Sequence, residues 1–301
     1  MAILRQDFKM LNFLIELMPK ESQLDVWQKL LKLLNSKQNE KSASAGRCLE
    51  RLTDINSYKT DEFTEYTWKH NCKSLIANKL YTSLSKALIE SSRDTVISSI
   101  IVLMNMINFG SHTKMKENVK IFLTENGYQC LVALIDKIEK LDDDLVTLVS
   151  KLLRKLSDCQ EKCEYFSNHE FKDMPLQLFD SLIKRLEKIR EPLILYAFTD
   201  FMSNLIEFNP KMNIDLNNLK ALTIIIISFL KLYHNNDNLM ASLLRLISLL
   251  ATCSSEIQNL LIEMGLSSFL IESLKSDVEN LKILAIECII QCCMLTTWLI
   301  V

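Results

Sequence analysis

Glycine and proline are scarce in this sequence, with four of each among 301 residues. Average usage would give roughly 21 glycines and 15 prolines in a chain of this length. A β-sandwich or a doubly wound α/β fold needs these residues at many turns and phosphate loops. Because no two glycines lie within ten residues of each other, a glycine-rich phosphate loop is excluded. The composition therefore favours helices joined by short polar turns.

An excess of one charge sign is also missing. The 35 basic and 37 acidic residues give a formal net charge of −2, so no global basic field points to nucleic acid or an anionic membrane. The apolar runs Ala221–Leu230 and Cys288–Val301 are shorter than the roughly 20 residues that a bilayer-spanning helix needs. We expect no nucleic-acid partner and no stable membrane insertion.

Sequence motifs of enzymes and metal centres are absent. There is no His-Glu-x-x-His, no Gly-x-Ser-x-Gly and no Cys-x-x-Cys pair. Cys159, Cys163 and His169 form a loose set, and a zinc ion would need Glu161 or Glu164 as a fourth ligand. We expect no catalytic residue, no cofactor and no bound metal, so the chain is predicted not to be an enzyme.

The nine cysteines are odd in number and scattered. The residues around Cys130, Cys253 and Cys288 are apolar, which indicates buried thiols. Charged residues at positions 5, 7 and 9 interrupt the apolar N-terminus, unlike a secretory signal. We expect a reducing compartment, cytoplasmic or nuclear.

Apolar residues recur at helical spacing almost throughout the chain. Aligned segments show a repeat of one apolar helix, a short polar turn and a second apolar helix. The second helices end near Leu52, Ile107, Leu156, Ile206, Leu250 and Cys292, at intervals of 42 to 55 residues. Such a period indicates a helical solenoid. The predicted repeats, within a single domain over residues 1–301, cover residues 24–55, 72–109, 121–158, 174–208, 216–252 and 257–293.

The last predicted repeat carries a family resemblance. The stretch Ile262–Leu266, followed by Phe269, Leu274, Ala285 and Ile289, resembles the armadillo consensus. In that family a glycine occupies the sharp turn between the first and second helices of a repeat. Gly265 matches this position, and so does Gly127 in the stretch Thr124–Tyr128. At both we expect the missing Cβ to allow close helix crossing.

The resemblance implies an all-α fold, a right-handed α-solenoid of about six degenerate armadillo/HEAT-like repeats. It also implies a way of binding, because many armadillo proteins hold extended peptides with a ladder of asparagines. Asn105, in Leu103–Met106, and Asn204, in Met202–Leu205, fit the family pattern Leu-x-Asn-Leu. No tryptophan accompanies either asparagine. They are therefore peptide-groove candidates, and the alternative is that they bridge neighbouring helices.

The resemblance implies a non-enzymatic scaffold or adaptor that binds protein partners. Two alternatives are a regulatory subunit of a kinase or phosphatase complex and a nuclear-transport or chromosome-associated factor. Similar degenerate repeats occur in centrosomal and ciliary scaffolds. The apolar C-terminal end, Met294–Val301, follows a near-consensus repeat. We expect this end to be a self-association surface or the cut edge of a longer array, unless Trp298 and Leu299 fold back and seal the last repeat.

Overall fold

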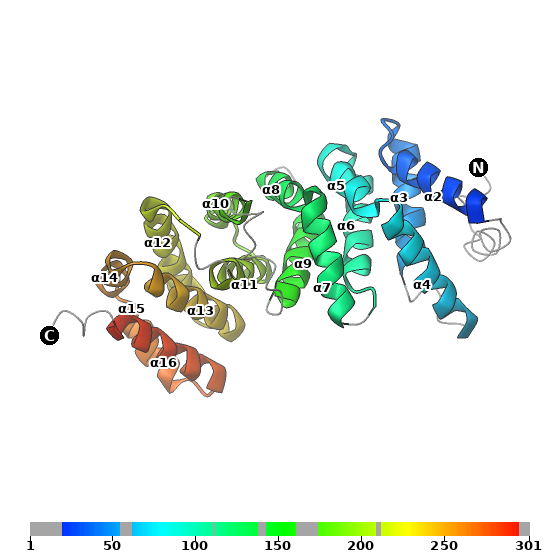
Figure 1. Ribbon diagram of the computed structural model, residues 1–301. Helices are drawn as coiled ribbons and strands as arrows, with labels where there is room; N and C mark the ends of the chain where they lie inside the picture. The colour runs from blue at the N-terminus through cyan, green and yellow to red at the C-terminus, as the bar shows by residue number, and fades with distance from the viewer. Residues whose placement is uncertain are drawn as a thin grey trace. The chain divides into compact units, whose positions relative to one another are not determined.

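The structure is a computed structural model that describes residues 20–54, 62–110, 112–137, 143–160, 174–208 and 212–294 (Figure 1). Within these ranges the chain forms helices and contains no β-strand. The expectation of an all-α fold is confirmed for this part of the chain.

Contacts between residues divide the chain into two compact units. The first unit contains the residues up to Lys137 together with Asp142–Lys155, and the second contains Ile138–Leu141 and the residues from Leu156 onward. A linear repeat array can be divided in this way, because each repeat contacts only its neighbours. The expectation of a single repeat domain is therefore not tested by the division and stays a prediction.

Within the described ranges, the first unit contains α-helices of 9 to 16 residues and one π-helical turn of five residues (Figure 1). They are α2 (Lys20–Leu34), α3 (Asn39–Thr53), α4 (Glu62–Ala77), α5 (Leu80–Glu90), α6 (Arg93–Ile107), α7 (His112–Phe122), the π-helical turn η3 (Leu123–Gly127) and α8 (Tyr128–Asp136). The next helix, α9 (Asp143–Gln160), begins in this unit and ends in the second. The most extensive packing in the first unit joins α3 to α6.

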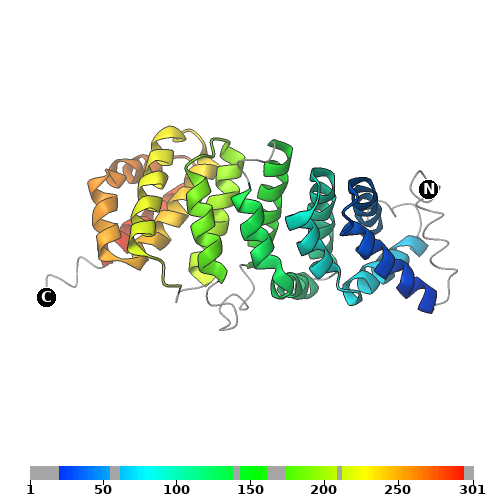
Figure 2. The same ribbon diagram turned by 90° about the horizontal axis from the view of Figure 1, so that it is seen from above.

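The second unit continues in the same way after the end of α9 (Figure 2). Its helices are α10 (Met174–Leu186), α11 (Pro192–Phe208), α12 (Leu216–Leu232), α13 (Asp237–Cys253), α14 (Ser255–Glu263), α15 (Leu266–Lys275) and α16 (Glu279–Met294). Helix α11 packs against α13, and α13 packs against α16. We call α3, α6, α9, α11, α13 and α16 the stacking helices, because each ends a group of two or three helices.

Helix α13 shows why the stacking helices lie next to one another. Its fully buried residues include Leu243, Leu244, Leu246 and Ile247, which occupy more than one face of the helix. A helix that is apolar on two faces needs a neighbour on each. Here α11 and α16 supply them. The repeat that contains α13 therefore does not bury its apolar surface alone, which is the property that defines a solenoid.

The short polar turns between helices provide N-caps. The side chains of Asp215, Asn236 and Ser254 accept hydrogen bonds from backbone N–H groups in the first turns of α12, α13 and α14. Such a cap is worth about 1 kcal/mol compared with alanine. The Ser, Asp and Asn residues that mark the turns in the sequence therefore also start the helices.

A left-handed backbone conformation recurs at one place in three groups of helices. Lys79 (φ 60°), Asn126 (φ 71°) and Gly265 (φ 85°) each lie at the corner that precedes α5, α8 and α15. Each corner joins a first helix, α4, α7 or α14, to the next. These groups thus have three helices, as armadillo repeats do. Positions 72 and 121, two predicted repeat starts, lie inside α4 and α7.

The two turn glycines lie at these corners, but for different reasons. A Cβ on Gly265 would meet no atom within 4 Å, so this residue serves the positive φ and not a close helix crossing. At Gly127 the φ is −59°, and a Cβ would lie 2.5 Å from the carbonyl oxygen of Phe122. Close approach is therefore the reason only at Gly127, and the expectation of close crossing is wrong for Gly265.

Substitutions at Gly265 test this distinction. Gly265→Ala should lower the free energy of unfolding by about 1–2 kcal/mol despite the open space, because alanine resists a positive φ. Gly265→Asn should cost less, since asparagine tolerates this conformation, as Asn126 does. Denaturant unfolding followed by circular dichroism measures both. Equal costs for alanine and asparagine would contradict the assignment of φ as the constraint.

Candidate functional site

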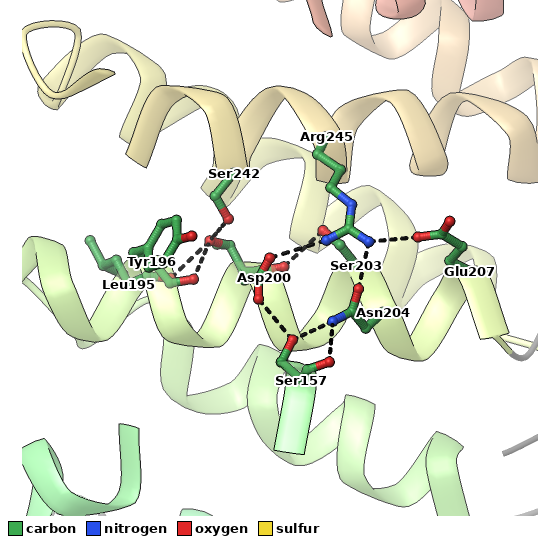
Figure 3. Close-up of polar contacts among 10 residues, drawn as sticks. Ser157, Leu195, Tyr196, Asp200, Ser203, Asn204, Glu207, Ser242 and Arg245 are labelled. Carbon is green, nitrogen blue, oxygen red and sulfur yellow. Dashed lines mark hydrogen bonds and ion pairs between the residues drawn. The ribbon is translucent and has the colours of Figure 1, made fainter. Parts of the chain in front are cut away.

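Polar side chains of three helices meet in the second unit in the Arg245 cluster, which consists of Ser157, Asp200, Asn204, Glu207 and Arg245 (Figure 3). Ser157 lies near the end of α9, and Arg245 lies on α13. The three residues between them share one face of α11, because positions i, i+4 and i+7 of a helix face the same way. The cluster therefore joins three successive stacking helices.

Arg245 reaches from α13 to α11 and makes three contacts there (Figure 3). Its Nη1 donates to Asp200 Oδ1 at 3.1 Å, and its Nη2 donates to Glu207 Oε2 at 2.6 Å and to Asn204 Oδ1 at 2.5 Å. The Arg245 side chain is 25% exposed and that of Glu207 is 47% exposed. Two carboxylates thus face one guanidinium at a partly open surface, with one negative charge in excess.

Asn204 lies beneath this surface and is only 1% exposed. Its Nδ2 donates to the hydroxyl of Ser157 and, at 3.3 Å, to the carbonyl oxygen of Ser157. Its Oδ1 accepts from Arg245. The expectation of an exposed amide in a peptide groove is therefore wrong for Asn204, because its amide nitrogen and its amide oxygen are both already hydrogen-bonded to neighbouring helices. Ser157 in turn donates to Asp200 Oδ2 at 2.7 Å.

Asn105 makes the corresponding contact in the first unit. Its Nδ2 donates to the hydroxyl of Thr53 at 3.2 Å, so α6 is joined to α3 as α11 is joined to α9. Asn105 keeps part of its surface exposed, and peptide binding by this residue stays a prediction. Because the two asparagines belong to different units, whether they share one groove is not tested. Both asparagines connect neighbouring helices, as the alternative to a peptide groove expected.

Hydroxyl pairs make the same kind of connection. Thr95 Oγ1 donates to Ser42 Oγ at 3.0 Å between α6 and α3. The hydroxyls of Thr199 and Ser242 share a hydrogen bond of 2.7 Å between α11 and α13. All four side chains are buried. Pairs of stacking helices are thus joined by polar contacts that set which residues lie opposite each other.

A cavity of about 510 Å³ adjoins the Arg245 cluster. Ile206 and Glu207 of α11, Leu219 of α12 and Leu249 and Thr252 of α13 line it. Glu207 belongs to both the cavity and the cluster, so its carboxylate lies at the edge of a partly apolar cavity. Its volume lies within the range of about 300–1,000 Å³ typical of ligand pockets.

The cysteines whose side chains the structure describes are all free, namely Cys48, Cys72, Cys130, Cys253, Cys288 and Cys292. Burial raises the pKa of Cys48 to about 11 and that of Cys130 to about 12. Such thiols carry little of the thiolate form that reacts as a nucleophile. Cys130 and Cys288 are buried as expected, whereas Cys253 is exposed, so that expectation is wrong for Cys253.

The described ranges contain no group of three His, Cys, Asp or Glu residues that could hold a metal ion. Cys163 and His169 lie outside these ranges, so the loose zinc set is not tested. None of the helices within the same ranges has the length and apolar character to cross a bilayer.

No protein-family model and no curated protein matches the sequence. Solved structures do match, at low identity. Computationally designed armadillo repeat proteins for modular peptide recognition give a TM-score of 0.61 at 15% identity, covering 88% of this chain and 98% of theirs. A designed armadillo repeat protein in complex with the peptide (KR)4 gives 0.57 at 14% identity, covering 88% and 98%. A chain from a study of the cadherin–β-catenin interaction gives 0.58 at 12% identity, covering 91% and 53%.

These similarities, together with the stacked helix groups, define the class of fold. The chain has the fold of armadillo repeat proteins, an α-solenoid, and the fold that the sequence resemblance implied is confirmed.

Substitution of the two asparagines should separate their energetic roles. Asn204→Ala removes a contact to a charged group and leaves buried partners unsatisfied, so it should lower the free energy of unfolding by about 2–3 kcal/mol. Asn105→Ala, which loses one partly exposed neutral hydrogen bond, should cost about 1 kcal/mol. Urea unfolding measures both changes. A neutral Asn204→Ala variant would contradict the assigned structural role.

Glu50 on α3 provides a test by pH. Burial raises its pKa, and the hydrogen bond from the Ser98 hydroxyl, at 3.4 Å, offsets part of the effect. When the pKa of a carboxyl group is higher in the folded state than in the unfolded state, the folded protein loses stability as the pH rises through the folded-state pKa. Glu50→Gln should therefore stabilise the protein more at about pH 7 than at about pH 4. Thermal unfolding at both pH values measures this, and a pH-independent difference would contradict the raised pKa.

Proposed function

We propose that this chain is a non-enzymatic scaffold that binds protein partners. The observation that carries the proposal is the Arg245 cluster beside its cavity on α11 and α13. The cluster and the cavity combine charged groups, hydrogen-bonding groups and an apolar surface on two packed helices. Those are features of a surface that recognises a ligand without changing it.

The chemistry of this surface favours a basic segment of the partner. Its excess carboxylate charge attracts a Lys or Arg side chain. Ile206, Leu219 and Leu249 provide the apolar contacts that the long stem of such a side chain can cover. The designed armadillo protein in complex with (KR)4 is a precedent for this class of ligand on the same fold. We therefore propose that Glu207 pairs with a cation of the partner at the cavity edge.

A scaffold role also agrees with the chemistry of the described side chains. The buried thiols of Cys48 and Cys130 have raised pKa values, which makes them poor nucleophiles. The free cysteines support our proposal that the protein works in a reducing compartment, the cytoplasm or the nucleus.

Fluorescence anisotropy with a labelled (KR)4 peptide tests the proposed surface. The wild-type protein should bind the peptide, with an affinity that falls as salt rises, because exposed charges are screened. Thr252→Trp should weaken binding by about tenfold or more, since Thr252 is an exposed residue of the cavity lining and tryptophan would fill the space.

Glu207→Gln should weaken binding about two- to fivefold through the lost charge. Glu272→Gln, which changes an exposed carboxylate on α15, is the matched control and should bind as the wild type does. Wild-type protein that fails to bind at about 100 µM, well above a micromolar Kd, would contradict the proposal for basic segments. So would equal losses in Glu207→Gln and Glu272→Gln.

A further inference from the structure

A second cavity in the second unit has a volume of about 400 Å³. The turn between α10 and α11 contributes Glu187 and Arg190 to its lining, and the last turn of α12 contributes Phe229, Lys231 and Leu232. Helices α10 and α12 pack against each other, so the lining comes from two neighbouring groups of helices (Figure 1). We call this cavity the Arg190 cavity.

The Arg190 cavity is separate from the cavity beside the Arg245 cluster. On α12, Phe229 lines the former and Leu219 lines the latter. At about 1.5 Å per residue, these two positions lie about 15 Å apart along the helix axis. A ligand of the Arg190 cavity therefore binds at another place on α12.

Arg190 is held from two sides at the edge of this cavity. Its Nη1 donates to the carbonyl oxygen of Ile189 at 2.9 Å and to that of Glu187, just beyond the end of α10. The carbonyl oxygen of Arg190 accepts from the hydroxyl of Tyr233 at 2.6 Å, which joins the turn to the end of α12. Because the arginine is already fixed, little side-chain entropy is lost when a ligand binds it.

The lining carries an excess of positive charge. Arg190 and Lys231 are cations and Glu187 is a carboxylate, so one positive charge remains. Neither cation forms an ion pair with another described residue. A carboxylate of a ligand is attracted by this charge, and an arginine can bind a carboxylate through two parallel hydrogen bonds. The Arg245 cluster, with one negative charge in excess, attracts the opposite kind of ligand.

Apolar side chains lie beside these charges. Ile225 and Phe229 line the cavity, and Leu232 is 59% exposed there. An aliphatic side chain of a ligand can cover them and remove apolar surface from water. One excess charge, by contrast, is too little for a nucleic-acid backbone, whose binding depends on several phosphate contacts. The lining therefore suits a peptide segment that combines acidic and aliphatic residues.

From these observations we propose that the Arg190 cavity binds an acidic segment of a protein partner. A carboxylate of the segment accepts from Arg190 and lies near Lys231, and an aliphatic neighbour contacts Leu232. Glu187 repels the segment and limits its affinity. The expected self-association end is a different surface, and its residues 295–301 lie outside the described part of the chain, so that expectation stays a prediction. The inference does not depend on the proposed function of the Arg245 cluster.

Fluorescence anisotropy with a labelled (EL)4 peptide, which alternates glutamate and leucine, tests this inference on the full chain. The wild type should bind (EL)4 and should bind the uncharged (QL)4 peptide at least fivefold more weakly. Lys231→Gln should weaken the binding of (EL)4 about two- to fivefold through the lost charge. Glu187→Gln should strengthen it by a similar factor, because a repelling carboxylate is removed.

Lys275→Gln, which changes an exposed lysine on α15, is the matched control and should bind (EL)4 as the wild type does. All three variants should keep the circular dichroism spectrum of the wild type, since the substituted side chains are exposed. Wild-type protein that fails to bind (EL)4 at about 100 µM would overturn the inference. Equal losses in Lys231→Gln and Lys275→Gln, or no gain in Glu187→Gln, would overturn it as well.

Discussion

The structure depends on one constraint, which is that stacking helices with two apolar faces must be covered on both sides. Helix α13 satisfies it through α11 and α16, and its residues Leu243, Leu244, Leu246 and Leu250 are fully buried. Burying one such leucine contributes about 1.5–3 kcal/mol, so contacts between successive helices outweigh any single polar contact. The order of helices in each unit follows from this requirement, since each group supplies the surface that its chain neighbours lack.

Polar side chains fix the register between neighbouring stacking helices, which apolar contacts alone do not determine. Asn105 to Thr53, Asn204 to Ser157 and Thr199 to Ser242 each join one stacking helix to another. A buried amide without partners costs about 1–3 kcal/mol, so a shifted register is disfavoured wherever such a residue lies. Around Arg245 the same kind of contact extends to a partly exposed surface.

Sequence periodicity predicted the all-α fold and the resemblance predicted the solenoid, because helical spacing and repeat length depend on local residues. The corner at Gly265 was found for the same reason. The corner at Lys79 was not predicted, because nothing in a single sequence indicates that a lysine has a positive φ. The sequence left two positions open for Asn204, a peptide groove or a bridge between helices, because the outcome depends on Ser157 and Arg245, 47 and 41 residues away. Serine and threonine at matched positions of successive stacking helices are a signal that could have suggested these contacts.

Hydrogen exchange measured by mass spectrometry on the full chain tests the central claim, stacking by nearest neighbours. Leu281→Ala creates a cavity beneath α16 that should cost about 2–5 kcal/mol. In a solenoid, amide exchange should accelerate in α13, α15 and α16 and stay unchanged in α3 and α6. Equal acceleration along the whole chain would indicate a single cooperative core and contradict the account.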